Sequence, residues 1–202
     1  PGTSEGPSLN VPVSTMLASS RRPISLPPLN DSARRFEHLL IDGHNVLFTL
    51  SNYLAGRPVV LGTDGYIRDI GGTHTRLPRD ERFTRIAEIL CRTLAISRFA
   101  RFTILLDAPL PWSREHRSIL LERWQSILEK NESKVDVSSQ PPLEIVLEDH
   151  VDRTIAATRE SAIATSDTGI LNRCEAPVAD IGGTIVRDAF DAALVELTPH
   201  KE

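Results

Sequence analysis

The chain has 202 residues, of which 40% are hydrophobic and 25% are charged, and its formal net charge is −4. This composition is typical of one globular domain with some additional chain, and it excludes a collagenous, a wholly disordered or a membrane-spanning protein. Two cysteines are too few for a disulfide scaffold or a cysteine-rich zinc site, which favours a reducing, cytoplasmic compartment.

The N-terminal third of the chain begins without regular patterning and then becomes apolar. Residues 1–35 are rich in Pro, Ser and Gly, so we predict a flexible arm ahead of a folded domain at 36–202. An apolar run at 36–42 predicts a buried strand, and helical spacing predicts a helix over 45–54. The Gly-rich segment 56–78 is predicted to be a functional loop or a small hairpin.

The rest of the chain alternates apolar strands with amphipathic helices. In chain order we first predict a helix capped by Asp80, a strand at 102–107, a helix capped by Ser113 and a polar connection at 131–142. A strand at 144–147, a helix at 149–160, strands at 162–167, 177–181 and 184–186, and a helix at 188–197 are predicted to follow. Because the strands are continuously apolar, both faces of their sheet are expected to be buried. The pattern predicts an α/β sandwich with a mostly parallel central sheet.

Three of the predicted strands end in aspartate, at Asp42, Asp107 and Asp167. The carboxyl ends of parallel strands open onto one crevice, so these acids are expected to lie together. Their mutual repulsion is tolerable if a divalent cation neutralises them, and oxygen ligands of this kind suit Mg²⁺ or Mn²⁺. Such a site can activate water for attack on a phosphodiester. Any single one of these acids can equally be a helix cap or a turn former.

Three further residues lie close to these strand ends in the sequence. Asp152, near the start of a predicted helix, either reaches the crevice or stabilises the helix N-terminus. Asn45 either orients a carboxylate or a water, or caps its helix. His44 either assists proton transfer or is simply a hydrogen-bonded side chain.

The segment 63–69 is the most unusual part of the Gly-rich region. Its charged residues predict either a flap whose Arg68 contacts a phosphate, or a β-turn followed by a structural Arg–Asp pair. Two hydroxyl residues flank Asp167. The predicted substrate-binding residues are Arg68, Asp64, Asp69, Ser166 and Thr168.

Charge is distributed unevenly along the chain. Residues 57–101 carry nine Arg and five acids, whereas residues 102–202 carry ten Lys and Arg against eighteen acids. This favours either a basic rim beside an acidic centre or ordinary solvated faces. Trp112, beside Pro111, either stacks on a base or packs at the edge of the sheet.

Three segments resemble the PIN and NYN ribonuclease superfamily. The superfamily begins with a strand and turn that carry an Asp and, three residues later, often an Asn, and this chain has LLIDGHNVLFTL. The superfamily's acidic helix position is similar to HVDRTI, and its later strand is similar to AIATSDTGIL. The ordered series over residues 36–190 most closely resembles an uncharacterised PIN-like family of unknown function. The resemblance implies a PIN-like three-layer sandwich and metal-dependent cleavage of phosphodiester bonds, in RNA rather than DNA.

Carried over by position, the resemblance also implies roles for individual residues. Metal ligands are implied at Asp42, Asp152 and Asp167, with supporting positions at Asn45 and Asp107. Many NYN members have a second acid two residues after the one that matches Asp167, where this chain has Gly169. The missing ligand would then come from Asp180, Asp64 or Asp69.

The sequence therefore supports one main hypothesis and two alternatives. The main hypothesis is a cytoplasmic, Mg²⁺- or Mn²⁺-dependent endoribonuclease with a nucleic-acid partner, no membrane partner and a homodimeric assembly. Its predicted catalytic residues are Asp42, Asp107, Asp152, Asp167 and Asn45. The first alternative is an inactive PIN-like domain that binds RNA or protein, which Gly169 and the net negative charge favour. The second is a small-molecule phosphatase or nucleotide-binding protein with a closed pocket.

Overall fold

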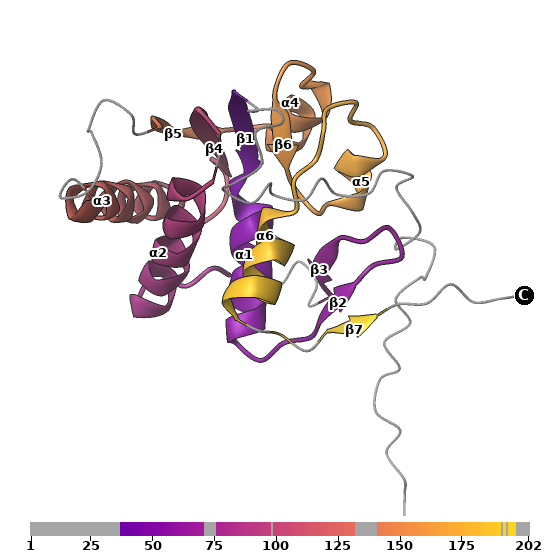
Figure 1. Ribbon diagram of the computed structural model, residues 1–202, viewed down its shortest axis with the longest axis horizontal. Helices are drawn as coiled ribbons and strands as arrows, with labels where there is room; N and C mark the ends of the chain where they lie inside the picture. The colour runs from indigo at the N-terminus through magenta and orange to yellow at the C-terminus, as the bar shows by residue number, and fades with distance from the viewer. Residues whose placement is uncertain are drawn as a thin grey trace, which may run out of the picture.

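A four-stranded parallel sheet forms the centre of the fold (Figure 1). The structure is a computed structural model, which describes residues 37–70, 76–97, 99–131, 141–190, 192 and 194–196. The predicted arm at 1–35 lies outside these residues. The strands of the central sheet, in spatial order, are β5 (Leu143–Glu148), β4 (Arg101–Asp107), β1 (His38–Asp42) and β6 (Ala162–Ala164).

Helices cover both faces of this sheet. Successive residues of a strand point to opposite faces, so each strand contributes side chains to two separate cores. Leu39 and Ile41 of β1 face one core, whereas Leu40 faces the other. The first core is formed with α1 (Gly43–Leu54), α2 (Glu81–Ala95) and α3 (Ser113–Asn131), and the second with α4 (Val151–Ala157) and α5 (Thr168–Leu171). The predicted three-layer α/β sandwich is confirmed. None of the helices in the described ranges is long and apolar enough to span a membrane.

The order of the strands creates a topological switch point beside β1. The chain passes from β1 to β4 and then to β5 on one side, but returns to add β6 on the other side of β1. In sheets of this kind, ligands bind outside the carboxyl ends of the strands on either side of the switch point. Ile41 pairs with Ala164, so the residues that follow these two strands emerge side by side.

Two predicted helix caps have different outcomes. Asp80 accepts a hydrogen bond from the backbone N–H of Arg82 at 3.0 Å and caps α2 as predicted. Ser113 was predicted to cap α3, but it is the first residue of that helix. Its hydroxyl oxygen lies 2.6 Å from the carbonyl oxygen of Asp107 and 2.8 Å from that of Leu110, and it donates its single hydrogen between these two acceptors. Ser113 therefore closes the turn that follows β4.

The Gly-rich segment forms a small hairpin, which is one of its two predicted structures. Strands β2 (Val59–Leu61) and β3 (Ile67–Asp69) pair antiparallel, and β7 (Val195–Glu196) pairs parallel to β2. Gly65 has a φ of 88°, so a turn residue without a side chain is needed between the two strands. This hairpin lies beside the C-terminal half of α1 (Figure 1).

The predictions for the C-terminal part were wrong in two places. Instead of a strand at 184–186 there are α6 (Ile181–Thr184) and η3 (Ile185–Ala189), a π-helical segment. A short buried apolar run has no periodicity that separates strand from helix, and Asp180 starts a helix here by accepting the N–H of Gly183. The predicted helix at 188–197 is likewise wrong, because η3 ends at Ala189. The predicted strand at 177–181 is reduced to one bridge between Val178 and Ile163.

Candidate active site at the carboxyl edge of the sheet

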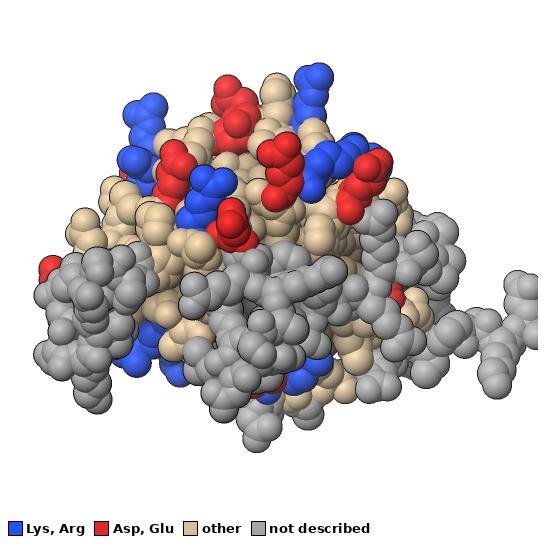
Figure 2. All heavy atoms as spheres, turned by 45° about the horizontal axis from the view of Figure 1, so that its top comes forward, with Lys and Arg blue, Asp and Glu red and all other residues tan. Residues whose placement is uncertain are grey.

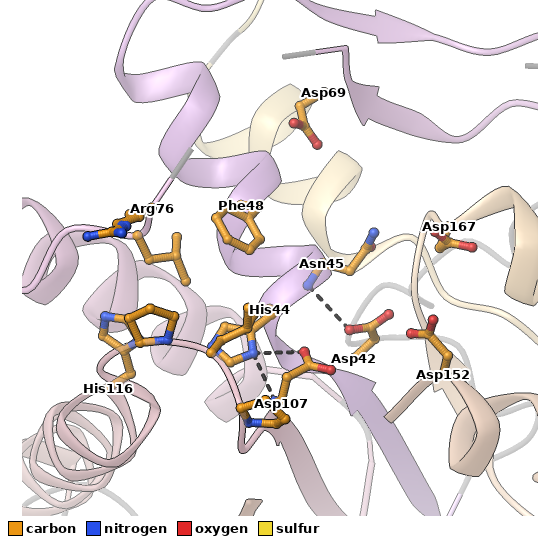
Figure 3. Close-up of a pocket in the computed structure, with 14 residues that line it drawn as sticks. Asp42, His44, Asn45, Phe48, Asp69, Arg76, Asp107, His116, Asp152 and Asp167 are labelled. Carbon is orange, nitrogen blue, oxygen red and sulfur yellow. Dashed lines mark hydrogen bonds and ion pairs between the residues drawn. The ribbon is translucent and has the colours of Figure 1, made fainter. Parts of the chain in front are cut away.

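A pocket of about 800 Å³ opens at the carboxyl edge of the central sheet (Figure 3). It is lined by residues from both sides of the switch point. The lining residues are Asp42, His44, Asn45, Phe48, Asp69, Arg76, Leu77, Asp107, Pro109, Leu110, Pro111, His116, Asp152 and Asp167. The structure thus brings together all five residues that the sequence predicted to be catalytic.

Asp42 lies at the end of β1 and is almost completely buried, with 4% of its surface exposed. It caps α1 by accepting the backbone N–H of Asn45 at 3.3 Å, and it accepts the hydroxyl of Thr165 at 3.0 Å. Burial, followed by the charges of Asp107 and Asp152, raises the pKa of Asp42 to about 7 against the hydrogen bonds that lower it. Without a bound cation, Asp42 is therefore only partly ionised at neutral pH.

Gly43 explains why α1 begins so close to β4. A Cβ atom at this position would lie within 2.7 Å of the side chains of Ile104 and Leu106 and of the carbonyl oxygen of Leu105. Only glycine allows the first turn of α1 to approach the strand so closely. This approach brings Asp42 next to the end of β4, where Asp107 lies.

Asp107 is held in place by His44. The Nδ1 atom of His44 lies 2.9 Å from Oδ2 of Asp107 and 2.9 Å from the backbone nitrogen of Asp107, so according to its tautomer it donates to the carboxylate or accepts the N–H. His44 is 3% exposed, and its Nε2 has no hydrogen-bond partner within the described residues. Of the two interpretations of His44, the structure shows the hydrogen-bonded side chain, and proton transfer stays a prediction. The imidazole fixes the orientation of one carboxylate in the pocket.

Asp152 and Asp167 form the opposite side of the acidic group (Figure 3). Asp152 is in the first turn of α4. Asp167 lies three residues beyond β6, because this strand ends at Ala164 and not at 167 as predicted, and it caps α5 by accepting the N–H of Ile170 at 2.9 Å. Partial burial and then the charges of Asp167 and Asp107 raise the pKa of Asp152. Capping and lining the pocket are therefore compatible roles for one aspartate.

Asn45 is oriented by Ser166 and not by a helix cap. Its Oδ1 atom accepts the backbone N–H of Ser166 at 2.8 Å and the hydroxyl of Ser166 at 3.1 Å. Because an N–H can only donate, the carboxamide oxygen must face Ser166, which leaves the nitrogen as the available donor. Ser166 and Thr168, two predicted substrate-binding residues, do not line the pocket. Ser166 instead positions Asn45.

The charged residues of the hairpin show the predicted structural pair. Arg68 donates to both carboxylate oxygens of Asp64, at 2.9 and 2.5 Å, and its Nε donates to the carbonyl oxygen of Ser166 at 2.7 Å. Burial would raise the pKa of Asp64, but the hydrogen bonds and charge of Arg68 lower it. Neither residue lines the pocket, so a phosphate contact by Arg68 stays a prediction that the geometry does not favour.

The three residues proposed to replace the missing acid at Gly169 have different positions. Asp69 lines the pocket and accepts the side-chain N–H of Asn52 at 2.6 Å. Asp64 and Asp180 do not line it. Asp180 accepts the backbone N–H groups of Ile67 and Gly183, and burial raises its pKa. Only Asp69 is available to ligands of the pocket.

The acids of the pocket are not neutralised by the protein. Within the described ranges, none of Asp42, Asp107, Asp152 and Asp167 forms an ion pair with Lys or Arg. In the same ranges, no three His, Cys, Asp or Glu side chains already form a group that holds a metal ion. On the face that Figure 2 shows, acidic and basic side chains are interspersed over the described surface. The acidic charge of the pocket is thus local.

One protein family matches this chain, over residues 32–183. The chain belongs to the family described as Domain of unknown function (DUF5616). Every residue that lines the pocket lies within the matched segment. The chain matches no curated protein and no solved structure. Membership of this family assigns no activity, so the relation to PIN and NYN ribonucleases stays a prediction.

The DUF5616 domain also has a pocket wall that the sequence did not reveal. It consists of apolar side chains with one cation and one imidazole. Its residues are Phe48, Arg76, Leu77, Pro109, Leu110, Pro111 and His116. The signal in the sequence was the run DAPLP, in which two prolines within four residues of the strand-end acid Asp107 end the strand and indicate a turn.

Proposed function

We propose that this chain is a metal-dependent nuclease that hydrolyses phosphodiester bonds, with RNA as its substrate. The observation that carries the proposal is the convergence of Asp42, Asp107, Asp152 and Asp167 on one pocket without any Lys or Arg partner in the described ranges. They come from four separate elements at a topological switch point. RNA, rather than DNA, and a homodimer rest on the sequence alone. A reducing, cytoplasmic location likewise rests on the sequence, whose two cysteines are too few for a disulfide scaffold.

The donor set fits Mg²⁺ or Mn²⁺. All of the charged donors are carboxylate oxygens, and the raised pKa values of Asp42 and Asp152 reflect burial and like-charge repulsion that a dication would relieve. Mg²⁺ usually keeps several waters and binds one or two carboxylates together with substrate phosphate, so a preformed group of three ligands is not required. Asp42, Asp152 and Asp167 would hold the ion.

The residues around the acids have separate roles in this proposal. When bound, the cation would neutralise the carboxylates and polarise the phosphate that is attacked. Asn45, fixed by Ser166, donates from its carboxamide nitrogen to a phosphate oxygen. Asp107 accepts a proton from the attacking water at Oδ1, the oxygen that His44 does not contact. The water oxygen bonds to phosphorus as the bond to the leaving sugar oxygen breaks, and that oxygen takes a proton from solvent water to become the product hydroxyl.

Single substitutions of the pocket acids test the proposal. Asp42→Asn and Asp167→Asn should each lower Mn²⁺-dependent cleavage of a single-stranded RNA by at least about 100-fold, because each removes a charge that holds the ion. The matched control is Asp149→Asn, an exposed aspartate near α4 that does not line the pocket, and it should retain full activity. Wild-type rates in a folded Asp42→Asn variant would refute the proposal.

The second candidate function is a non-catalytic domain that binds RNA or protein. It is favoured by the separation of the acids, since no three of the described ligand-type side chains form a ready metal group, and by Gly169. In that case RNA binding would persist unchanged in chelator, and no cleavage would follow the addition of Mn²⁺.

A further inference from the structure

The turn between β4 and α3 presents apolar side chains to solvent at the mouth of the pocket. Pro109, Leu110 and Pro111 line the pocket, directly after the end of β4 that carries Asp107. Leu110 is 37% exposed and Trp112 is 38% exposed, and they are two of only four large hydrophobic residues that are exposed in the described ranges. An exposed apolar surface that continues into a polar pocket indicates a binding surface.

Trp112 is held in an unfavourable backbone conformation. Its φ of 69° makes it the one residue other than glycine with a positive φ in the described ranges. For a bulky side chain this conformation costs of the order of 1 kcal/mol or more, and the surrounding structure must impose it. In this conformation the indole ring remains partly exposed.

Two arginines next to this turn lack acidic partners. The guanidinium carbon of Arg79 lies 4.0 Å from the centre of the Trp112 ring, and Arg76 lines the pocket. Neither forms an ion pair within the described ranges, whereas Arg68 and Arg82 each pair with an aspartate. The turn therefore combines an aromatic face with uncompensated positive charge, which is the combination that single-stranded nucleic acids bind.

We propose that this turn is a base-binding subsite, in which one unpaired base of the substrate lies against Leu110 and Trp112 while adjacent phosphates contact Arg76 and Arg79. The placement of the cleaved bond at the acids rests on the proposed nuclease function. The binding itself does not, because it needs only the turn and the two arginines. The acids repel phosphate at one end of the pocket and the arginines attract it at the other, so the strand is oriented across the pocket.

A pair of probes tests the subsite without any cleavage. An RNA hexamer of adenylates and an abasic ribose-phosphate hexamer of the same charge are titrated against the full chain in chelator, with fluorescence anisotropy as the readout. The wild type should bind the RNA about tenfold more tightly, as expected for the stacking of one base. In addition, the RNA alone should quench the emission of Trp112, since the other tryptophan, Trp124, is buried against Phe102.

Two variants then separate stacking from charge. Trp112→Gly removes the ring, and glycine adopts the positive φ without strain, so the variant should fold and lose the preference for RNA over the abasic probe. Arg76→Gln, which leaves the Arg79–Trp112 contact in place, should weaken the binding of both probes and make the slope of log affinity against log salt shallower by about 0.7. The control Arg92→Gln changes an exposed arginine of α2 that pairs with Glu88, and it should change neither quantity.

The outcomes distinguish the subsite from the nuclease function. Equal binding of the two probes by the wild type, an unquenched Trp112, or a Trp112→Gly variant that keeps the preference would each overturn the subsite, whether or not Mn²⁺ supports cleavage. A base preference that depends on Trp112 supports the subsite even if the chain cleaves nothing, in which case only the nuclease proposal fails.

Discussion

Two groups of aspartates in this domain have very different surroundings: Asp64 and Asp180 are buried, whereas the pocket acids range from the buried Asp42 to the exposed Asp152. Beside the hairpin, Asp64 is paired with Arg68, and Asp180 accepts two backbone N–H groups. At the pocket, burial and then the charges of Asp107 and Asp152 raise the pKa of Asp42, and the charge of Asp107 also raises the pKa of Asp152. Arginine charges lower the pKa of both members of the first group against the effect of burial. In the second group, Asp42 and Asp152 each have a pKa that burial and the charges of neighbouring aspartates raise.

This difference identifies which acids belong to the structure and which to the candidate site. The bidentate Arg68 compensates the charge of Asp64, and two backbone N–H donors together with the charges of Arg187 and Arg68 lower the pKa of Asp180 against its burial. A carboxylate among like charges reduces the stability of the folded state, and its retention indicates a ligand. The predictions below test each side of this comparison, beginning with the largest effect.

Removing the partner of a structural aspartate should be the most damaging change. Arg68→Met leaves the completely buried carboxylate of Asp64 without its cation, and we expect a loss of about 3–5 kcal/mol in the free energy of unfolding. Urea denaturation measures this loss. The control Arg82→Met breaks an exposed pair with Asp80 and should leave the denaturation midpoint unchanged. Equal effects of the two substitutions would show that Asp64 is not a structural acid.

Removing the charge of a pocket aspartate should instead stabilise the domain when no metal is present. Because the pKa of Asp42 is raised to about 7 in the folded state, the ionised carboxylate costs up to about 4 kcal/mol above pH 7. Asp42→Asn avoids this cost but loses an acceptor oxygen worth about 1 kcal/mol. We expect a net gain of about 2–3 kcal/mol at pH 8 in chelator.

The sign of the pH dependence makes this prediction specific. A raised pKa means that the wild type is most stable while Asp42 is protonated, so its stability falls as the pH rises from about 4 to about 7. The advantage of Asp42→Asn should therefore grow over this range and disappear near pH 4. A variant that is less stable than the wild type at pH 8 would place Asp42 among the structural acids.

The smallest effect is expected from the residue that supports Asn45. Ser166→Ala removes the hydroxyl that donates to Oδ1 of Asn45 but keeps the backbone N–H bond. The lost hydrogen bond, worth about 1 kcal/mol, helps to orient Asn45, so its removal should lower the cleavage rate about fivefold and leave metal binding intact. Ser118→Ala, which removes an exposed hydroxyl from α3, serves as the control. A loss of metal affinity in Ser166→Ala would contradict the positioning role.

The sheet and the acids at its edge could be predicted because their signals are local. The runs that end in Asp42 and Asp107 are continuously apolar, and a strand buried on both faces needs such a run. Asp80 could be recognised as a cap for the same reason, since a cap depends on the next three residues. These elements required no knowledge of what lies elsewhere in the chain.

The other parts of the site depend on contacts between distant segments. The sequence showed Asp64, Arg68 and Asp69 together, but which of them face the pocket depends on how the hairpin lies against α1 and Ser166. The wall formed by Leu110 and its neighbouring prolines depends on a turn that Ser113 closes. Likewise, a two-residue strand such as β7 exists only because β2 is there to pair with it.

The response of unfolding to Mn²⁺ tests the central claim most directly. If the unpaired acids form a metal site, Mn²⁺ at about 100 times its dissociation constant should raise the free energy of unfolding of the wild type by about 2.7 kcal/mol, because the ion binds only the folded state. The same titration should leave Asp42→Asn unchanged. A wild type that gains no stability from Mn²⁺, or a variant that gains as much as the wild type, would contradict the account.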